Sequence, residues 1–451
     1  MNAANVSDLY KKHLSALDES LGRSLELAGQ AGRRYKSVVF HAGSPIIYHR
    51  DDRPMPFWPC AHFRRWVPPL STPENVVHAR PGEKPQVYRV LAKDYWHDTS
   101  PPAPSYWEDA VELIEVESFD AVVAALGTLD GAAYVGPSAA AAQKLGLGDA
   151  VEPAELMAPL DWFRAYKTDF EIDRTTIACQ KAAAGHIAAR KSFKAWGTER
   201  QIHWKFLEAS EQLEGELPYD TIVALDAKGA ILHYQNKRND TDPGKVLLMD
   251  AGAACDGYAS DITRTWAMDD CENEFLAMLN AMDELEQDLV AMVTPGRPYL
   301  DIHLAAYRGV ARILVETGAI TTSVDEAVDS GLVSAFFPHG VGHHMGLHVH
   351  DAGGHQAGPD GGEVKPPAEH PFLRNTRVLE AGHLITIEPG LYFIPMLLAP
   401  HREGENAGRV DWDLIDRLTP HGGIRIEDNI VCTDGEPVDL TRPLVPGPRG
   451  E

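Results

Sequence analysis

Cysteine is scarce in this sequence of 451 residues. The five cysteines are scattered, odd in number and never spaced as Cys-x-x-Cys. This pattern argues against a disulfide framework and against a zinc site built from thiolates. The residues concerned are Cys60, Cys179, Cys255, Cys271 and Cys432.

Basic residues are also few relative to acidic ones. The sequence has 41 Lys and Arg against 66 Asp and Glu, a formal net charge of −25. Because such a chain repels both phosphate backbones and anionic lipid, we expect no binding to nucleic acid or to membranes. The acidic excess is compatible with clustered carboxylates whose charge a bound cation offsets.

Long hydrophobic runs are absent as well. No stretch of about 18 apolar residues could span a bilayer, and the N-terminus lacks the uninterrupted apolar core of a signal peptide. The first residues instead predict an amphipathic helix with leucines at 9, 14, 17 and 21. We therefore expect a soluble protein of the reducing cytoplasm.

What the sequence does contain is enough apolar material, 44% of residues, for two domains. Residues 1–160 alternate strand-like segments (37–43, 86–93, 132–138) with a helical one (121–129), which predicts an α/β domain. Residues 161–175 are expected to form the linker or the start of a helix.

The second half has a different pattern, which predicts a catalytic domain over 176–440 and a tail over 441–451. Helix formers dominate up to residue 213, and 272–293 and 302–316 also favour helices. Strand-like segments lie between glycine and asparagine turns, at 221–225, 230–234, 245–252, 260–268, 383–393 and 422–431. Paired strands with a few long helices predict an α+β domain with a curved antiparallel sheet.

Acidic residues occur in several of these strands. Asp250 ends one apolar run and Asp261 lies in the next, and their spacing suits a hairpin that would make the carboxylates face each other. Buried like charges are unfavourable unless they are protonated or neutralised by a cation. The alternative is that both aspartates simply cap strand ends.

Two glutamates, Glu388 and Glu427, lie in similar strand contexts, although glutamate is rarely buried without a partner. Arg425 precedes Glu427 by two residues, so a strand places both side chains on one face. A structural ion pair would explain that arrangement equally well.

Histidines are concentrated in the segment FFPHGVGHHMGLHVHD. Imidazole is both a common metal ligand and the proton carrier suited to neutral pH. With four carboxylates it would form an oxygen-rich site that prefers Mn²⁺, although Co²⁺ or Zn²⁺ could occupy it. Two such ions could activate a shared water molecule. The histidines are His339, His343, His344, His348 and His350.

The set Asp250, Asp261, His343, Glu388 and Glu427, in that order and within HGVGHHMGLHVHD, TIEPGLYF and GGIRIEDNIV, resembles the pita-bread metallopeptidases. That family includes aminopeptidase P, methionine aminopeptidase, creatinase and prolidase. The motifs are most similar to those of bacterial Xaa-Pro dipeptidases, a subgroup that also contains organophosphorus acid anhydrolases. The resemblance implies a C-terminal pita-bread domain preceded by a smaller α/β domain.

The same resemblance implies an activity. Two divalent metals, Mn²⁺ foremost, would hold a bridging hydroxide that attacks an Xaa-Pro dipeptide and releases proline. Phosphotriester hydrolysis, as main or side activity, is the alternative within the enzyme class. Aminopeptidase action on longer peptides and a non-catalytic binding protein are disfavoured, the latter because all five ligands are present.

Roles for individual residues also follow from the resemblance. Asp250 would bind one metal, Asp261 and Glu427 would bridge both, and His343 and Glu388 would bind the second. Glu388 would also be the general base. His339, His350 and His233 would contact the substrate and the tetrahedral intermediate, whereas His344 and His348 would have no such role.

Further positions complete the expected site. Arg374 would anchor the free carboxylate of proline, which explains a limit to dipeptides. Arg425 would support Glu427, and Thr263 would support Asp261. Tyr219, Tyr299 and Leu232 would approach a small substrate pocket, and Asp52 and Trp96 would reach the active site of the other subunit in a homodimer.

Overall fold

The computed structural model describes residues 3–96, 105–240 and 243–448. The chain divides into two compact units. The first comprises residues 1–173 and 356–363, and the second comprises 174–355 and 364–451. A short segment of the second half of the chain therefore groups with the first unit.

The first unit is built on a five-stranded mixed sheet in the order β4-β3-β2-β1-β5. β1 pairs antiparallel with β2 and parallel with β5, and β3 pairs parallel with β4. Val39, Val76 and Tyr134 belong to its buried core. The strands are β1 (Ser37–His41), β2 (Val76–Ala79), β3 (Gln86–Val90), β4 (Glu112–Val116) and β5 (Ala132–Val135).

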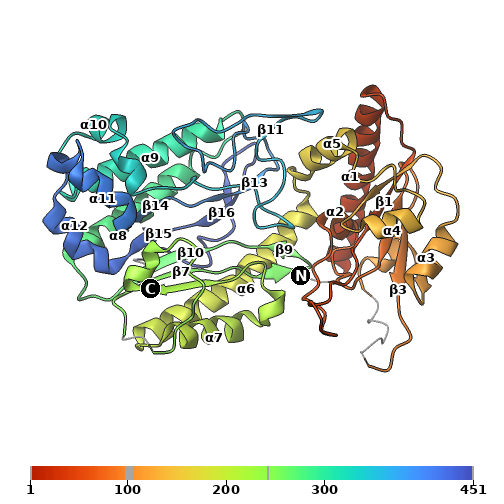
Figure 1. Ribbon diagram of the computed structural model, residues 1–451, viewed down its shortest axis with the longest axis horizontal. Coiled ribbons are helices and arrows are strands. Elements are labelled where there is room, and N and C mark those ends of the chain that lie inside the picture. The colour runs from red at the N-terminus through yellow and green to blue at the C-terminus, as the bar shows by residue number, and fades with distance from the viewer. Residues whose placement is uncertain (1–2, 97–104, 241–242, 449–451) are drawn as a thin grey trace. The chain divides into compact units, whose positions relative to one another are not determined.

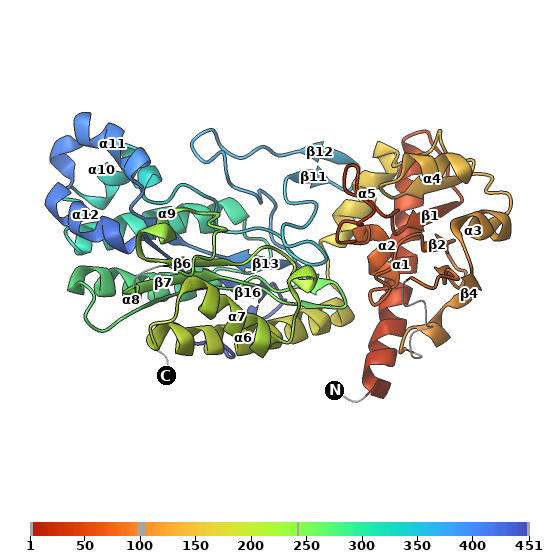
Figure 2. The same cartoon turned by 60° about the horizontal axis from the view of Figure 1, so that its bottom comes forward.

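Helices complete this unit, which confirms the predicted mixture of helix and strand. The N-terminal helix α1 (Ala3–Gln30) packs against α5 (Ala154–Arg164). α3 (Phe119–Leu126) packs against β3 and β4. The hairpin of β11 (Gln356–Gly358) and β12 (Gly361–Glu363) lies beside α5, as Figure 2 shows. Two shorter helices are α2 (Ala61–Trp66) and α4 (Ala139–Lys144).

The second unit contains antiparallel sheets. One has the order β10-β7-β6, another β13-β16-β17, and β14 pairs with β15. An isolated bridge between Thr263 and Glu427 connects the first of these sheets to the segment before β16. The strands are β6 (Ile222–Leu225), β7 (Val246–Asp250), β8 (Ala254–Cys255), β9 (Tyr258–Ala259), β10 (Thr263–Ala267), β13 (Leu384–Ile387), β14 (Gly390–Tyr392), β15 (Gly423–Arg425), β16 (Asp428–Val431) and β17 (Val438–Asp439).

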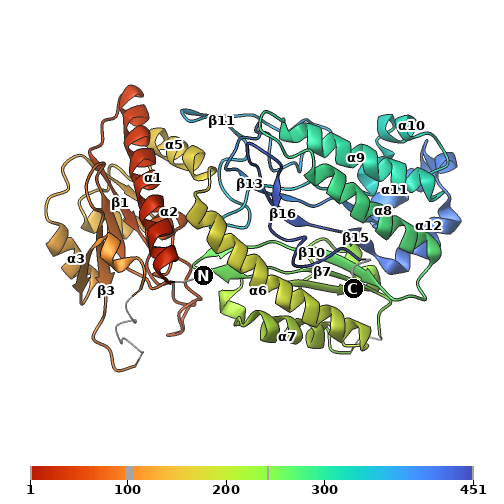
Figure 3. The ribbon, with the colours of Figure 1, turned by 180° about the vertical axis from the view of Figure 1, so that it is seen from behind.

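Two pairs of helices cover these sheets from one side (Figures 1 and 3). α6 (Asp169–Lys194) and α7 (Glu199–Ser210) bury apolar side chains against β6, β7 and β10. α8 (Asn273–Val290) and α9 (Tyr299–Glu316) pack together and against the core that includes β13 and β16. The remaining helices are α10 (Val324–Asp329), α11 (Pro395–Glu403) and α12 (Trp412–Leu418). Within the described residues, no helix is apolar over a length that would cross a membrane.

Sequence patterns misplaced one strand. The predicted strand at 230–234 is instead the end of a 3-10 helix, η3 (Asp226–Ala230), followed by a turn in which Tyr234 N donates to Ile231 O at 3.1 Å. The 3-10 helix begins at Asp226, whose backbone is left-handed and whose carboxylate accepts hydrogen bonds from the N–H groups of Lys245 and Val246. An apolar run alone cannot reveal that side-chain cap.

Two long predicted strands are each broken in the middle. The segment 383–393 forms β13 and β14, interrupted at Glu388 and Pro389, and 422–431 forms β15 and β16, interrupted at Ile426 and Glu427. Proline cannot donate a ladder hydrogen bond, which favours the first break. Both glutamates thus lie at strand breaks, where side chains can leave the pleat.

Candidate metal centre and active site

A cavity of about 720 Å³ opens in the second unit, a size typical of small-molecule sites. It is lined by eleven of the residues predicted from the sequence. These are Leu232, His233, Asp250, Asp261, His339, His343, His350, Arg374, Glu388, Arg425 and Glu427.

The strand breaks fix the two glutamates. The backbone N–H of Glu388 donates to Val341 O at 2.8 Å, which connects β13 to the histidine-rich segment. The N–H of Glu427 donates to Thr263 O at 3.0 Å, and the Thr263 hydroxyl donates to Glu427 Oε2 at 2.6 Å. Thr263 therefore orients the Glu427 carboxylate, whereas the sequence predicted that it supports Asp261.

Three potential ligands converge at the floor of the cavity. Donor atoms of Asp261, His343 and Glu427 all lie within 4.8 Å of one another. His343 Nδ1 lies 2.9 Å from the carbonyl oxygen of His344, so this nitrogen donates a hydrogen bond. His343 Nε2 faces Asp261 Oδ2 at 3.4 Å and Glu388 Oε1 at 3.7 Å, and despite burial these carboxylates raise the pKa of His343.

Both carboxylate oxygens of Asp250 accept hydrogen bonds from neighbouring side chains. Its Oδ1 accepts a hydrogen bond from the Tyr219 hydroxyl at 2.8 Å, and its Oδ2 accepts one from Arg425 Nη2 at 2.7 Å. Arg425 also donates to the Tyr392 hydroxyl at 2.9 Å, which in turn lies 2.8 Å from His339 Nε2. A chain of hydrogen bonds thus connects a predicted ligand to a predicted catalytic histidine.

The electrostatics of the cavity are unbalanced. Burial raises the pKa of Glu388 to about 7, and burial with neighbouring carboxylates raises the pKa of Glu427 well above its usual range. Burial also raises the pKa of Asp250 despite its ion pair with Arg425. Among the four cavity carboxylates, only Asp261 has a lowered pKa, because hydrogen bonding to His343 outweighs burial.

These carboxylates fit a bound cation. Positive charge at the cluster would favour the ionised forms that burial disfavours, and a set of carboxylate oxygens with one imidazole suits hard or borderline divalent ions. The residues present therefore match a divalent metal centre.

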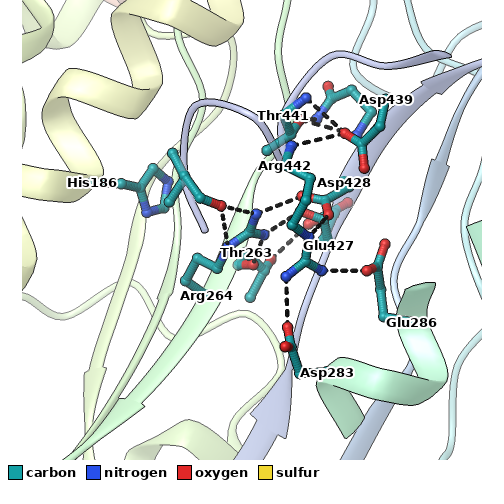
Figure 4. A network of polar contacts seen from close by, with 12 residues as sticks. His186, Thr263, Arg264, Asp283, Glu286, Glu427, Asp428, Asp439, Thr441 and Arg442 are labelled. Atoms are coloured by element: carbon teal, nitrogen blue, oxygen red, sulfur yellow. Dashed lines mark hydrogen bonds and ion pairs between the residues drawn. The ribbon is translucent and has the colours of Figure 1, made fainter. Parts of the chain in front are cut away.

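Behind Glu427 lies a second polar network, shown in Figure 4. Arg264, fully buried, donates to the carbonyl oxygens of Thr263 and Glu427 at 2.9 and 2.8 Å, and to Asp428 Oδ1 at 2.6 Å. Arg442 donates to Asp428 Oδ2 at 2.8 Å and to Asp283 Oδ1 at 2.6 Å. This network fixes the backbone that presents Glu427 to the cavity.

The other predicted contact residues lie on the cavity wall. The His350 ring meets the His343 ring edge-to-face, with centroids 4.4 Å apart. Burial, and then the nearby charge of His343, lowers the pKa of His350 to about 4, so it is neutral at pH 7. Within the described part of the chain, the exposed Arg374 guanidinium has no hydrogen bond or ion pair, although it faces the cavity.

Several predicted residues are not on the cavity wall. Tyr219 lies behind Asp250, and the fully buried Tyr299 donates its hydroxyl to Thr386 O at 2.8 Å. Neither tyrosine is among the lining side chains. His344 is buried against His383 and His348 is exposed, and neither lines the cavity.

Asp52 and Trp96, predicted to act across a dimer interface, belong to the first unit, and both are exposed. Their role requires a second chain and stays a prediction.

Sequence reasoning missed three residues that shape the site. Tyr392 joins Arg425 to His339, Arg264 holds the Glu427 backbone, and Asn429 Oδ1 accepts a hydrogen bond from the Asp261 N–H at 2.9 Å. Tyr392 and Asn429 lie in the quoted motifs TIEPGLYF and GGIRIEDNIV. Their closeness to Glu388 and Glu427 in the sequence suggested a role at the site. The contact of Tyr392 with Arg425, however, depends on the pairing of β14 with β15, which the sequence does not show.

Comparison with known proteins agrees with this geometry. A model of metallopeptidase family M24 matches residues 173–434, and a model of the Xaa-Pro dipeptidase N-terminal domain matches residues 8–162. Fold and cavity together thus define a metal-dependent peptidase. More particularly, the chain belongs to metallopeptidase family M24, and membership implies divalent metal ions.

Relatives with assigned names extend over the whole chain. It is 40% identical over 453 residues to an Xaa-Pro dipeptidase of Xanthomonas campestris, covering 99% of this chain and 100% of that protein. It is 37% identical over 441 residues to one of Proteus mirabilis, covering 97% and 98%.

Solved structures support the fold. Aminopeptidase P of Escherichia coli superposes with a TM-score of 0.72 at 21% identity, covering 96% of each chain. The aminopeptidase PepP of Pseudomonas aeruginosa gives 0.70 at 22% identity, covering 95% and 96%. The predicted pita-bread domain with a smaller α/β domain before it is confirmed.

Proposed function

We propose that this protein is an Xaa-Pro dipeptidase that releases C-terminal proline. The observation that carries the proposal is the pairing, in one cavity, of a carboxylate–histidine cluster with an unpaired guanidinium, that of Arg374. The first supplies a metal centre and the second supplies a partner for a free carboxylate. The named relatives are dipeptidases of this kind.

Two divalent ions, Mn²⁺ foremost with Co²⁺ or Zn²⁺ as alternatives, are proposed at the cluster. Such ions lower the pKa of water, so that a hydroxide nucleophile is available near neutral pH. The residues proposed to hold them are Asp250, Asp261, His343, Glu388 and Glu427.

Side chains of the protein would carry out proton transfer and bind the substrate. Glu388 is proposed to accept and return a proton as the general base. His350 is neutral and keeps an N–H donor for an oxygen that gains negative charge. His233 and His339 are proposed to complete the contacts with the scissile group, and Leu232 to form an apolar wall.

Arg374 would set the length of the substrate. Its guanidinium can form a bidentate pair with the terminal carboxylate of a dipeptide, whereas a longer peptide presents a neutral amide at the same distance. Tyr219 and Tyr299 would act from behind the wall, by positioning Asp250 and the segment around Thr386.

We further propose a homodimer in which Asp52 and Trp96 approach the active site of the other subunit, and a cytoplasmic location, consistent with five free cysteines. Phosphotriester hydrolysis has no specific observation in its favour and is used below only as a control reaction.

The direct test measures proline release from Ala-Pro and Ala-Pro-Ala by chelator-treated protein, with and without added Mn²⁺. Metal-dependent cleavage of the dipeptide alone is expected. Equal cleavage of the tripeptide would mean that Arg374 imposes no carboxylate requirement, and failure to cleave either peptide would contradict the proposed activity.

A further inference from the structure

A second group of metal-ligand side chains lies apart from the cavity. Cys271 Sγ is 3.9 Å from Glu272 Oε2 and 3.8 Å from His421 Nδ1. One donor atom from each of these residues lies within 4.8 Å of the other two. None of the three, which we call the Cys271 cluster, lines the cavity that holds the proposed active site.

The backbone fixes these donors from two distant parts of the chain. Glu272 is the residue immediately before α8, and His421 ends the 3-10 helix η6 (Thr419–His421). The His421 ring packs 5.1 Å from the ring of Phe275, centroid to centroid, and hydrogen-bonds Glu272. The cluster is therefore formed by the fold. Because nearly 150 residues separate Glu272 from His421, no sequence motif predicts it.

Burial and charge also suit a small cation. Cys271 and His421 are buried, whereas the Glu272 side chain is 39% exposed, so an ion can reach the cluster from solvent. Burial, and then the charge of Glu272, raises the pKa of the Cys271 thiol to about 11. A bound cation would displace this proton, as expected when metals bind thiols. Lys245, whose charge acts on Cys271 and Glu272, is paired with Asp270 at 3.0 Å.

We propose that Cys271, Glu272 and His421 form a separate site for a borderline divalent ion such as Zn²⁺, Co²⁺ or Cd²⁺. Thiolate, imidazole and carboxylate are the donors zinc prefers, and three of them leave a further position for water. The cavity offers carboxylates and imidazole without cysteine, and so favours harder ions. The two sites are thus distinguished by ligand softness, and the inference does not depend on the proposed peptidase activity.

Sulfur makes the site visible by spectroscopy. Full-length protein, first loaded with Mn²⁺, is titrated with Co²⁺ under anaerobic conditions while near-ultraviolet absorption is recorded. Only a thiolate ligand gives a sulfur-to-cobalt charge-transfer band, so Co²⁺ that enters the cavity contributes none. We expect a band that saturates at one equivalent of thiolate-bound Co²⁺.

Matched variants identify the sulfur. Cys271→Ser should abolish the band, and His421→Gln should weaken Co²⁺ binding by at least about 10-fold. Cys432→Ser, which removes another buried cysteine outside the cluster, should leave the band unchanged. If Cys271→Ser fails to fold, the His421→Gln result decides.

No band in the unaltered protein, a band that survives Cys271→Ser, or unchanged affinity in His421→Gln would overturn the proposal.

Discussion

Two groups of buried carboxylates meet at the peptide between Glu427 and Asp428, and they are neutralised in different ways. On the inner side, Asp428 and Asp283 face the guanidinium groups of Arg264 and Arg442 (Figure 4). Burial raises the pKa of the neighbouring Glu286 well above its usual range, although its carboxylate also pairs with Arg442. Each of these three carboxylates therefore has a guanidinium partner on this side.

On the cavity side, four carboxylates face a single buried guanidinium among the described residues, that of Arg425. Their pKa values respond accordingly, and three of the four are raised. Burying unpaired charge is costly. The comparison therefore indicates that the carboxylates on the cavity side bind a cation that the chain itself does not supply. The inner network is structural and the cavity side is functional.

The largest expected effect comes from removing one charge on the cavity side. Asp261→Asn should lower proline release by more than the roughly 10–100-fold that loss of an outer partner costs, because it removes a proposed ligand. Bound metal, measured by elemental analysis, should fall in parallel. In the metal-free state, Glu427→Gln should be at least as stable as the unaltered protein, because it removes a carboxylate whose pKa is raised by burial and by the neighbouring carboxylates. Full activity with undiminished metal would contradict the proposed role.

The matched change on the inner side should do the opposite. Asp428→Asn breaks ion pairs with both Arg264 and Arg442, and should lower the free energy of unfolding by about 3–5 kcal/mol. Denaturant unfolding in the presence of a chelator measures this directly. If Glu427→Gln and Asp428→Asn change stability alike, the distinction between the two sides is wrong.

The comparison also predicts a pH dependence for metal-free protein. The pKa of Glu388 is raised from 4.5 to about 7, so between these values the folded state holds a proton that the unfolded state has released. Stability from this group is therefore complete below pH 4.5 and is lost as the pH rises through 7.

Mn²⁺ binds the ionised form, so its stabilising effect should be greater at about pH 8 than at about pH 5. Thermal unfolding with chelator and with Mn²⁺ at each pH tests this. An equal shift at both values would argue against carboxylate ligands whose pKa is raised.

A smaller effect is expected at the cavity wall. Arg374→Ala should raise KM for Ala-Pro by about 30-fold, equivalent to about 2 kcal/mol for a charged hydrogen bond. Hydrolysis of a neutral phosphotriester, if measurable, should change little. Arg374→Lys keeps the charge without the bidentate geometry. Its KM for Ala-Pro should lie between that of the unaltered protein and that of Arg374→Ala. Equal losses on both substrates would show that Arg374 is not a carboxylate anchor.

The smallest expected effect concerns the hydrogen bonds between Arg425 and His339. Tyr392→Phe removes the hydroxyl that both contact, and should lower kcat/KM about fivefold, or ~1 kcal/mol. A shift in the pH profile should accompany the loss, because His339 loses its partner. Tyr134→Phe removes a similar tyrosine–histidine contact, with His41 in the first unit, and should leave the profile unchanged.

Much of this site could be predicted from the sequence. Eleven residues named from the motifs and from the family resemblance that they carry line one cavity. What could not be predicted depends on contacts between distant segments. Arg264 and Arg442 have no local pattern that marks them. The 3-10 helix that replaces the predicted strand at 230–234 begins at Asp226, whose carboxylate binds the backbone of the distant Lys245.

The fold was likewise predicted only in part. Alternating apolar segments predicted β7, β10, β13 and β16, since buried strands carry that pattern by themselves. The breaks at Glu388 and Glu427 were not predicted, because they depend on hydrogen bonds to Val341 and Thr263 from other elements. Those breaks are what bring the two carboxylates to the cavity.

The central claim is that divalent cations supply the charge missing from the cavity side. Its most direct test is the metal content of chelator-treated protein during titration with Mn²⁺, measured together with proline release from Ala-Pro. The account predicts two Mn²⁺ per chain and activity that rises with their binding. Cleavage by metal-free protein, or no Mn²⁺ bound by folded protein, would contradict it.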